Sequence, residues 1–152
     1  MTPCDEILVS QLLLLGQSCR LQRGNVYHLE VYENATGDNA TNYPCYVYRK
    51  SDYSPETELT GEASVEDETF EVTCVSQDSE SLRCLARALQ KTYRYSYLEK
   101  LQATMPYVLD WLVDNDTEQN EFAVEQQDKG YKTATMLVKI VVNTLEGVEQ
   151  CL

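Results

Sequence analysis

The chain has 152 residues and a mass of 17.4 kDa, a length that suits a single domain with one hydrophobic core. Its 25 Asp and Glu residues outnumber 12 Lys and Arg, which gives a formal net charge of −13. General nucleic-acid binders and binders of anionic membranes need a cationic surface, so this balance argues against both. No basic stretch precedes the apolar run at residues 7–15, which is also too short to span a membrane. We therefore expect a soluble, intracellular protein.

Cysteine spacing predicts no metal site. The six cysteines are Cys4, Cys19, Cys45, Cys74, Cys84 and Cys151. None forms a C-x-x-C pair, the spacing typical of zinc ligands. The even count leaves a disulfide framework open, but a chain of this size buries a core unaided, and a cytosolic setting keeps thiols reduced. We expect structural or incidental free cysteines, with Cys45 and Cys74 pointing inward from strands.

Catalytic motifs are not visible in the chain. His28, the only histidine, lies in an alternating strand pattern, and no nucleophile context of the Ser-x-Gly or Cys-Gly type occurs. A Cys–His dyad stays open, because such partners meet in space rather than in sequence. The six glycines are not clustered into a phosphate-binding loop. An enzyme would need a carboxylate pair such as Asp110 with Asp114, and solvated acids are commoner at such positions. We expect no enzyme and no cofactor.

Helix and strand signals alternate along the first half of the chain. Thr2 and Pro3 predict the start of a helix whose apolar residues cover nearly its whole circumference. Residues 26–33 alternate as a strand, and residues 34–42 are polar turn formers. A second strand is expected at residues 43–49.

The second half begins with residues 51–69, which are too polar to pack inside and predict a long exposed hairpin or a mobile loop. Residues 70–74 alternate as a half-buried antiparallel strand. A helix then begins at Asp78 or Ser79, with apolar residues at the 3.6-residue period. The remaining predicted strands are residues 107–113, 121–125 and 135–144.

This order predicts a single α+β domain over residues 1–152, an antiparallel sheet covered on one face by helices. The last strand is expected to turn Met136, Val138, Ile140 and Val142 toward one face, with Lys139 on the other. The uncovered face is expected to carry Tyr46, Tyr48, Leu137 and Val141. Eleven tyrosines against two phenylalanines are typical of apolar surfaces that also hydrogen-bond, as at protein interfaces.

Charge is segregated along the sequence. The acid-rich loop holds Asp52, Glu56, Glu58, Glu62, Glu66, Asp67 and Glu68. Residues 110–128 hold seven more acids, Asp110, Asp114, Asp116, Glu118, Glu121, Glu125 and Asp128, and neither stretch contains Lys or Arg. The second helix carries a stripe formed by Arg83, Arg87, Lys91 and Arg94.

These charges have two interpretations. Both sets can be ordinary solvated faces. Alternatively, an acidic patch on one copy meets the basic stripe of the next, and a head-to-tail contact of that type closes into a ring. Acidic loops facing a central channel would then repel a polyanion passing through it.

Several of these segments resemble the tail terminator (tail completion) proteins of tailed bacteriophages. The resemblance rests on Tyr43-Pro44-Cys45-Tyr46-Val47-Tyr48-Arg49, on Leu59-Thr60-Gly61, on Phe70-Glu71-Val72-Thr73-Cys74, and on Leu82-x-x-Leu85-Ala86-x-x-Leu89. The leading helix, a late acidic turn and a closing hydrophobic strand also have counterparts, so the resemblance spans residues 3–144. These motifs are patterns of residue class and include no catalytic set.

The resemblance implies a homohexameric ring in the virion, at the head-proximal end of the tail, assembled in the host cytoplasm. The ring would stop growth of the tail tube and join it to head-closure (connector) proteins, and DNA would pass through its channel without specific binding. The loop 51–69 would project toward the tube or lumen, and the second helix would contact a neighbouring subunit. Two alternatives stay open: another ring protein of the head–tail joint or tail tube, and an acidic DNA mimic that inhibits a DNA-binding enzyme.

Overall fold

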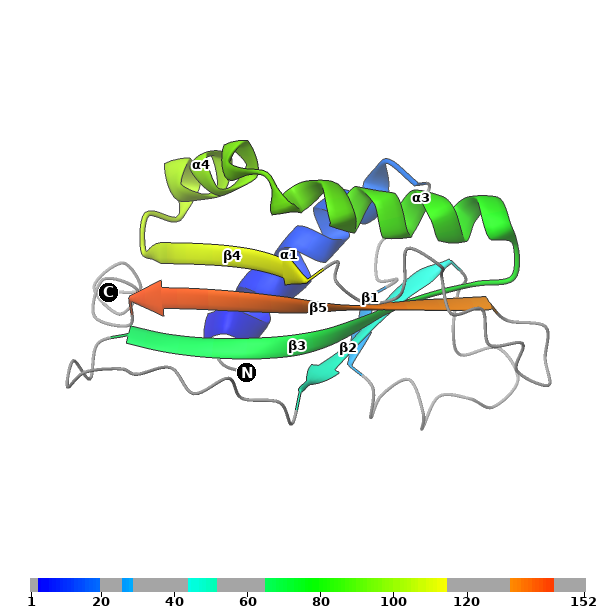
Figure 1. Cartoon of the computed structure of the whole chain (residues 1–152), viewed down its shortest axis with the longest axis horizontal. Coiled ribbons are helices and arrows are strands. Elements are labelled where there is room, and N and C mark those ends of the chain that lie inside the picture. Colours follow the sequence, from blue (N-terminus) through cyan, green and yellow to red (C-terminus); the bar gives the residue numbers. More distant parts are fainter. Residues whose placement is uncertain (1–2, 20–25, 29–43, 52–64, 115–131, 144–152) are drawn as a thin grey trace.

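A computed structural model describes residues 3–19, 26–28, 44–51, 65–114 and 132–143 of the chain. Its elements are α1 (Pro3–Gln17), β1 (Val26–His28), β2 (Cys45–Lys50), β3 (Val65–Ser76), α3 (Ser79–Gln90), the 3₁₀ turn η1 (Lys91–Tyr93), α4 (Tyr95–Thr104), β4 (Val108–Asp114) and β5 (Lys132–Asn143). They form an α+β domain in which three helices pack against a five-stranded sheet (Figure 1). The predicted fold class is confirmed.

The sheet has the strand order β1-β2-β3-β5-β4. β3 and β5 pair antiparallel over their full twelve residues and form its centre. A wholly antiparallel sheet was expected, but β1 pairs parallel with β2. A parallel pair needs a crossover of a dozen or more residues instead of a tight hairpin, and residues 29–44 between the two strands are long enough for one.

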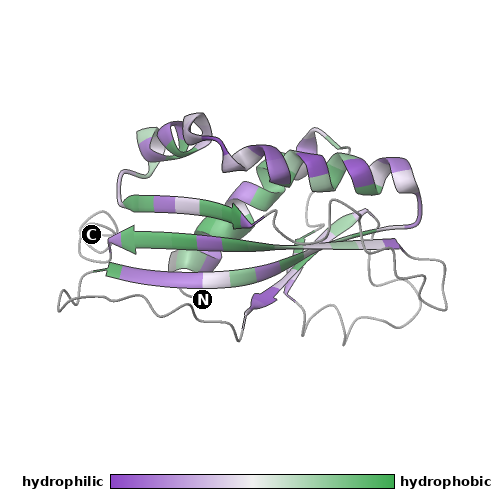
Figure 2. Cartoon of the chain, viewed as in Figure 1, coloured by the Kyte–Doolittle hydropathy of each residue, from purple (hydrophilic) through white to green (hydrophobic). Residues whose placement is uncertain are grey.

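The core lies between the helices and the covered face of the sheet. Strand positions alternate as predicted, since Phe70, Val72 and Cys74 of β3 are buried while Glu71 and Thr73 are only half-buried. The same cluster takes its other buried side chains from α1 (Cys4, Ile7, Leu8, Leu12), α3 (Leu82, Leu85, Ala86, Leu89) and β5 (Met136, Val138, Ile140, Val142). Figure 2 shows these apolar positions along the strands and on the inner side of α3.

Tyr46 and Tyr48 lie on the helix-covered face, so their prediction for the uncovered face was wrong. Both belong to the main core, and the buried Tyr46 hydroxyl donates to the Leu85 carbonyl oxygen at 2.8 Å. The uncovered face instead receives Cys45 and Val47 of β2, which form a small separate cluster. These four residues alternate along β2 and are similarly apolar, so the sequence pattern does not distinguish the two faces. The Leu85 carbonyl of α3 offers a hydrogen-bond acceptor to a buried tyrosine hydroxyl, which explains why the tyrosines face the helices.

The predicted loop 51–69 is also corrected, because β3 already begins at Val65. Asp67 and Glu68 therefore lie within the sheet, where Lys139 is 3.5 Å from Asp67 and Lys50 is 3.1 Å from Glu68. Lysines on the neighbouring strands thus neutralise the charges of these two carboxylates. The acidic residues themselves do not predict a strand from the sequence.

Glu66 belongs to β3 as well, so the three acids of this corrected segment do not form a projecting loop. The other loop candidates, Asp52, Glu56, Glu58 and Glu62, lie outside the described residues. The predicted turns at residues 34–42 and 59–61 and the strand at residues 121–125 lie outside them too.

Helix α4 was not predicted from the sequence. Tyr97 and Leu98 pack against the core, and Leu101 is buried in it. This i, i+1, i+4 spacing is a helical signal, but it covers only ten residues. The helix also begins after a break at Arg94, whose side chain makes no capping hydrogen bond. A short, weakly capped helix of this kind depends on tertiary contacts.

One pair of cysteines departs from the expected reduced state. Cys19 and Cys84 form a disulfide that ties the end of α1 to the middle of α3. Cys4, Cys45 and Cys74 are free and buried. Cys74 points into the main core as predicted, whereas Cys45, also predicted to point inward, lies on the other face of the sheet beside Val47. Burial raises the pKa of both Cys4 and Cys45 to about 12. Such thiols stay protonated and unreactive at neutral pH.

Alkaline pH is expected to destabilise the protein. The folded-state pKa of Cys4 and Cys45 lies above the ordinary thiol value of 9.0, so the unfolded chain loses these protons first as the pH rises. The free energy of unfolding should fall between pH 9 and about pH 12, by at most about 1.4 kcal/mol per pH unit for each thiol. Urea titrations from pH 8 to 11 measure this slope. The double variant Cys4→Ala, Cys45→Ala should reduce this slope but not remove it, because burial also raises the pKa of Cys74. A wild-type slope of zero would contradict the burial.

Candidate functional site

Helix α3 presents one face to the core and the opposite face to solvent. The Asp78 carboxylate caps it by accepting from the Ser81 backbone N–H at 2.6 Å and from the Ser81 hydroxyl at 2.7 Å. These hydrogen bonds hold the pKa of Asp78 below its usual value. Leu82, Leu85, Ala86 and Leu89 fix the inner face. The helix therefore has one defined outer face, and its charged residues lie there.

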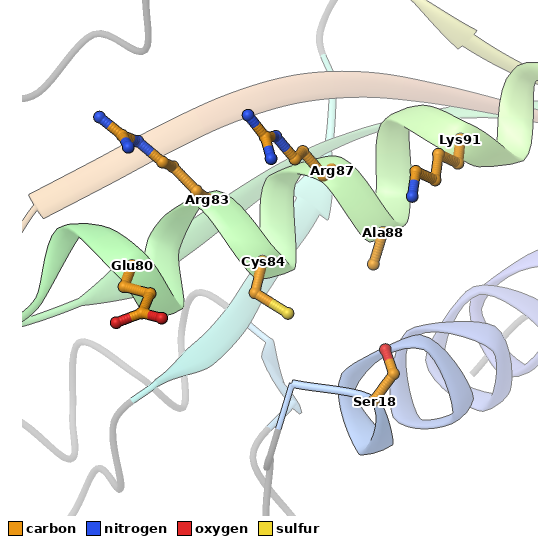
Figure 3. A pocket seen from close by; sticks show the side chains of 7 residues that line it. All are labelled: Ser18, Glu80, Arg83, Cys84, Arg87, Ala88 and Lys91. Atoms are coloured by element: carbon orange, nitrogen blue, oxygen red, sulfur yellow. The ribbon is translucent and has the colours of Figure 1, made fainter.

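The predicted cationic stripe is exposed in the structure. Arg83 and Arg87 project from the outer side of α3, and Lys91 follows on η1 (Figure 3). Four helical residues rise about 6 Å, so successive cations lie about one turn apart. Arg94, the fourth candidate, is also exposed and lies at the N-cap of α4. We call these four residues the cationic face.

No residue of the cationic face forms an ion pair within the described part of the chain. The strand cations differ, since Arg49, Lys50 and Lys139 each pair with a carboxylate. In a protein with 25 acidic residues, these four exposed cations form a positive surface that has no ion pair among the described residues. Such a surface attracts a carboxylate-bearing partner.

A hollow of about 430 Å³ lies beside α3, between that helix and the end of α1. Its lining residues are Ser18, Glu80, Arg83, Cys84, Arg87, Ala88 and Lys91. Figure 3 shows Cys84 and Ala88 on the side of α3 that faces Ser18. Cys84, one of the lining residues, is disulfide-bonded to Cys19. Figure 3 shows the Arg83 and Arg87 side chains pointing away from Ser18, so their charged ends lie on the solvent side of α3 rather than between the two helices.

Two exposed tyrosines extend the cationic face and were not singled out from the sequence. Tyr93 is 60% exposed and Tyr95 is 70% exposed, on either side of Arg94. Tyrosine and arginine together carry much of the binding energy at protein interfaces. The available signal in the sequence was the triplet Tyr93-Arg94-Tyr95, which begins two residues after Lys91.

The residues weighed for catalysis do not come together. Asp110 and Asp114 lie four residues apart in β4, which separates them by about 13 Å along the strand. Asp110 instead accepts a hydrogen bond from the Trp111 backbone N–H at 2.9 Å. His28 contacts Tyr48 edge to face, with ring centroids 5.2 Å apart. Among the described residues there is no cluster of three His, Cys, Asp or Glu side chains that could hold a metal ion.

None of the described helices is long and apolar enough to cross a membrane. Of the acids at residues 110–128, the structure describes Asp110 and Asp114, and the others lie outside the described residues. Of the segments on which the resemblance rests, residues 45–49 lie in β2, residues 70–74 in β3 and residues 82–89 in α3, and these elements are neighbours in the fold. Residues 59–61 lie outside the described residues. In comparisons with known proteins, no family model matches the chain, and no curated protein matches its sequence.

Proposed function

We propose that this protein is a structural virion component that assembles into a ring and terminates the tail of a tailed bacteriophage. In this proposal six copies form a ring at the head-proximal end of the tail tube. The ring contacts the tube protein on one side and a head-closure protein on the other. The genome passes through the channel without specific binding. The residue patterns in β2, β3 and α3 support this family over other ring proteins.

The observation that carries the assembly part of the proposal is the cationic face. Its side chains have no ion-pair partner among the described residues, while fourteen of the 25 acids lie in two sequence segments without a base. A positive surface and a negative segment on every copy allow each copy to bind the next head to tail. Such a contact gives a closed ring when the rotation from one copy to the next is a whole-number fraction of a full turn.

The mechanism of termination is geometric. A closed ring leaves no free subunit edge, and its outer end offers the tube no further surface for addition. The excess of acid over base gives the ring a negative charge, which repels the phosphate backbone of DNA in the channel. Transport of DNA then requires no binding and release step.

The location of the protein on virions tests the proposal. A tagged copy is expressed during infection, and purified particles are examined by negative-stain microscopy with gold-labelled antibody against the tag. We expect label at the head–tail junction and six-fold density there in averaged images. An untagged infection is the control for background label. A protein absent from particles and bound to a host enzyme would contradict the proposal and support the acidic DNA mimic.

A further inference from the structure

We propose that Cys84 is a site of thiol–disulfide exchange with small thiols of the glutathione class, and that this exchange opens and closes the covalent tie between α1 and α3. The inference stands apart from the proposed function. It starts from the Cys19–Cys84 disulfide, which joins residues 65 positions apart in the sequence. The two halves of this disulfide differ in exposure, because Cys84 is half-buried and lines the hollow, whereas Cys19 is only 6% exposed.

Access determines which sulfur of a disulfide a thiolate attacks. Figure 3 shows the Cys84 sulfur pointing from α3 toward Ser18, on the side of the helix that borders the hollow. The hollow has a volume of about 430 Å³, within the range of about 300–1,000 Å³ found for small-molecule sites. A small thiol can therefore reach Cys84 from solvent, while Cys19 stays covered.

The exchange takes two steps. The thiolate of the small thiol forms a bond with the Cys84 sulfur, the bond to the Cys19 sulfur breaks, and Cys19 leaves as a thiolate that takes a proton from water. A second small thiolate then attacks the small-molecule sulfur of this mixed disulfide and releases Cys84. The cysteine pair gains two electrons and two protons, and two small thiols become one disulfide. An excess of the oxidised small molecule drives the same steps in reverse.

The other cysteines in the described part of the chain do not compete for this disulfide. Cys4, Cys45 and Cys74 are buried and free. Burial also raises the pKa of Cys4 and of Cys45 to about 12, so neither supplies a thiolate at neutral pH. Exchange between the described cysteines therefore stays confined to one pair, which closes in oxidising surroundings and opens where small thiols are abundant.

Opening the disulfide releases one end of α1 and leaves the rest of the helix in place. The first turns of α1 supply buried side chains to the main core, and the Tyr97 hydroxyl donates a hydrogen bond to the Gln11 side chain. Toward its other end, Leu14, Gln17 and Ser18 are exposed. The tie to α3 thus acts where α1 has few core contacts, beside the cationic face.

Two matched variants test the site of exchange. Cys19→Ala leaves Cys84 as a free thiol, and Cys84→Ala leaves Cys19, each in the full chain with Cys151→Ser, which removes the cysteine outside the described residues. Both variants are incubated with oxidised glutathione, and mass spectrometry of tryptic peptides follows the mixed disulfide. Cys84 is expected to react at least tenfold faster than Cys19. Neither variant has the tie, so its loss does not account for a difference. Equal rates, or faster reaction of Cys19, would overturn the inference.

A second experiment tests whether the tie opens within a folded protein. The Cys151→Ser chain is compared after treatment with oxidised glutathione and after reduction with excess reduced glutathione. Reduction should lower the melting temperature by at least about 5 °C, because the disulfide closes a long loop. Amide NMR signals of residues 13–19 should move, while the signals of the sheet stay dispersed, and reoxidation should restore both. An unchanged melting temperature, or collapse of the sheet signals on reduction, would show that no such switch exists.

Discussion

Replacing Arg83, Arg87 and Lys91 together by glutamate is expected to abolish self-association and leave the domain folded. All three side chains are exposed, so their replacement removes no core contact. In the proposed contact these cations attract an acidic patch of the next copy, and glutamates in their place repel it. Juxtaposed like charges cost several kcal/mol. We expect the dissociation constant of the contact to rise more than a hundredfold. Sedimentation velocity measures the oligomer mass, and incorporation into tails gives the same information if the free protein is monomeric.

The matched control keeps the charges and changes the side chains. Arg83→Lys, Arg87→Lys and Lys91→Arg should retain most of the self-association, because the positive surface stays in place. Circular dichroism should show the same helix content and a similar melting temperature for both triple variants. If the glutamate variant assembles with the wild-type mass and enters tails normally, the cationic face is an ordinary solvated surface.

Trp111→Ala is expected to destabilise the fold by about 3–5 kcal/mol, a large part of the stability of a domain of this size. The Trp111 side chain is buried under η1 and α4, and its ring lies 5.5 Å from the ring of Tyr97. Its indole N–H donates to the Thr92 hydroxyl at 2.9 Å, and that hydroxyl donates to the Leu89 carbonyl oxygen. Truncation leaves a cavity and also breaks this buried chain of hydrogen bonds. Urea unfolding at neutral pH measures the loss.

Two further variants give reference values for the loss of one buried hydrogen bond and for truncation of an exposed side chain on β4. Tyr46→Phe removes only the hydroxyl that donates to Leu85, so it should cost about 1 kcal/mol. Leu112→Ala, on the same strand as Trp111 but exposed, should cost less than about 1 kcal/mol. Equal effects of Trp111→Ala and Leu112→Ala would contradict the packing of β4 against η1 and α4.

The exposure of Arg83 and Arg87 could be predicted from the sequence because it follows from local periodicity, whereas Lys91 and Arg94, predicted on the same helix, lie beyond its end on η1 and at the N-cap of α4. Leu82, Leu85 and Leu89 fix which side of the helix is buried, and the arginines on the opposite side are then necessarily exposed. Tyr93 and Tyr95 could not be assigned in this way. Their exposure depends on the break at Arg94, where the chain leaves one helix and starts another.

The hollow beside α3 was not predictable from the sequence, because its two walls come from distant segments. Ser18 lies at the end of α1, and Cys84 lies 66 residues later on α3. The pairing of Cys19 with Cys84 depends on the same crossing of the two helices. Six cysteines permit many pairings, and nothing in their spacing selects this one.

The sequence by itself determined the α+β class, the amphipathic helix α3, the central strands and the segregation of charge. These features depend on residues close together in the chain, so periodicity and composition are sufficient to reveal them. Only the tertiary structure decided which face receives Tyr46 and Tyr48, that residues 65–69 form strand, and that β1 runs parallel to β2. Each of these features depends on a partner from another element. Tyr46 donates to the Leu85 carbonyl of α3, and the acids of β3 pair with lysines of β2 and β5. The direction of β1 is set by its pairing with β2. The energy of pairing between distant segments is gained only in the folded chain, so the local sequence pattern does not reveal it.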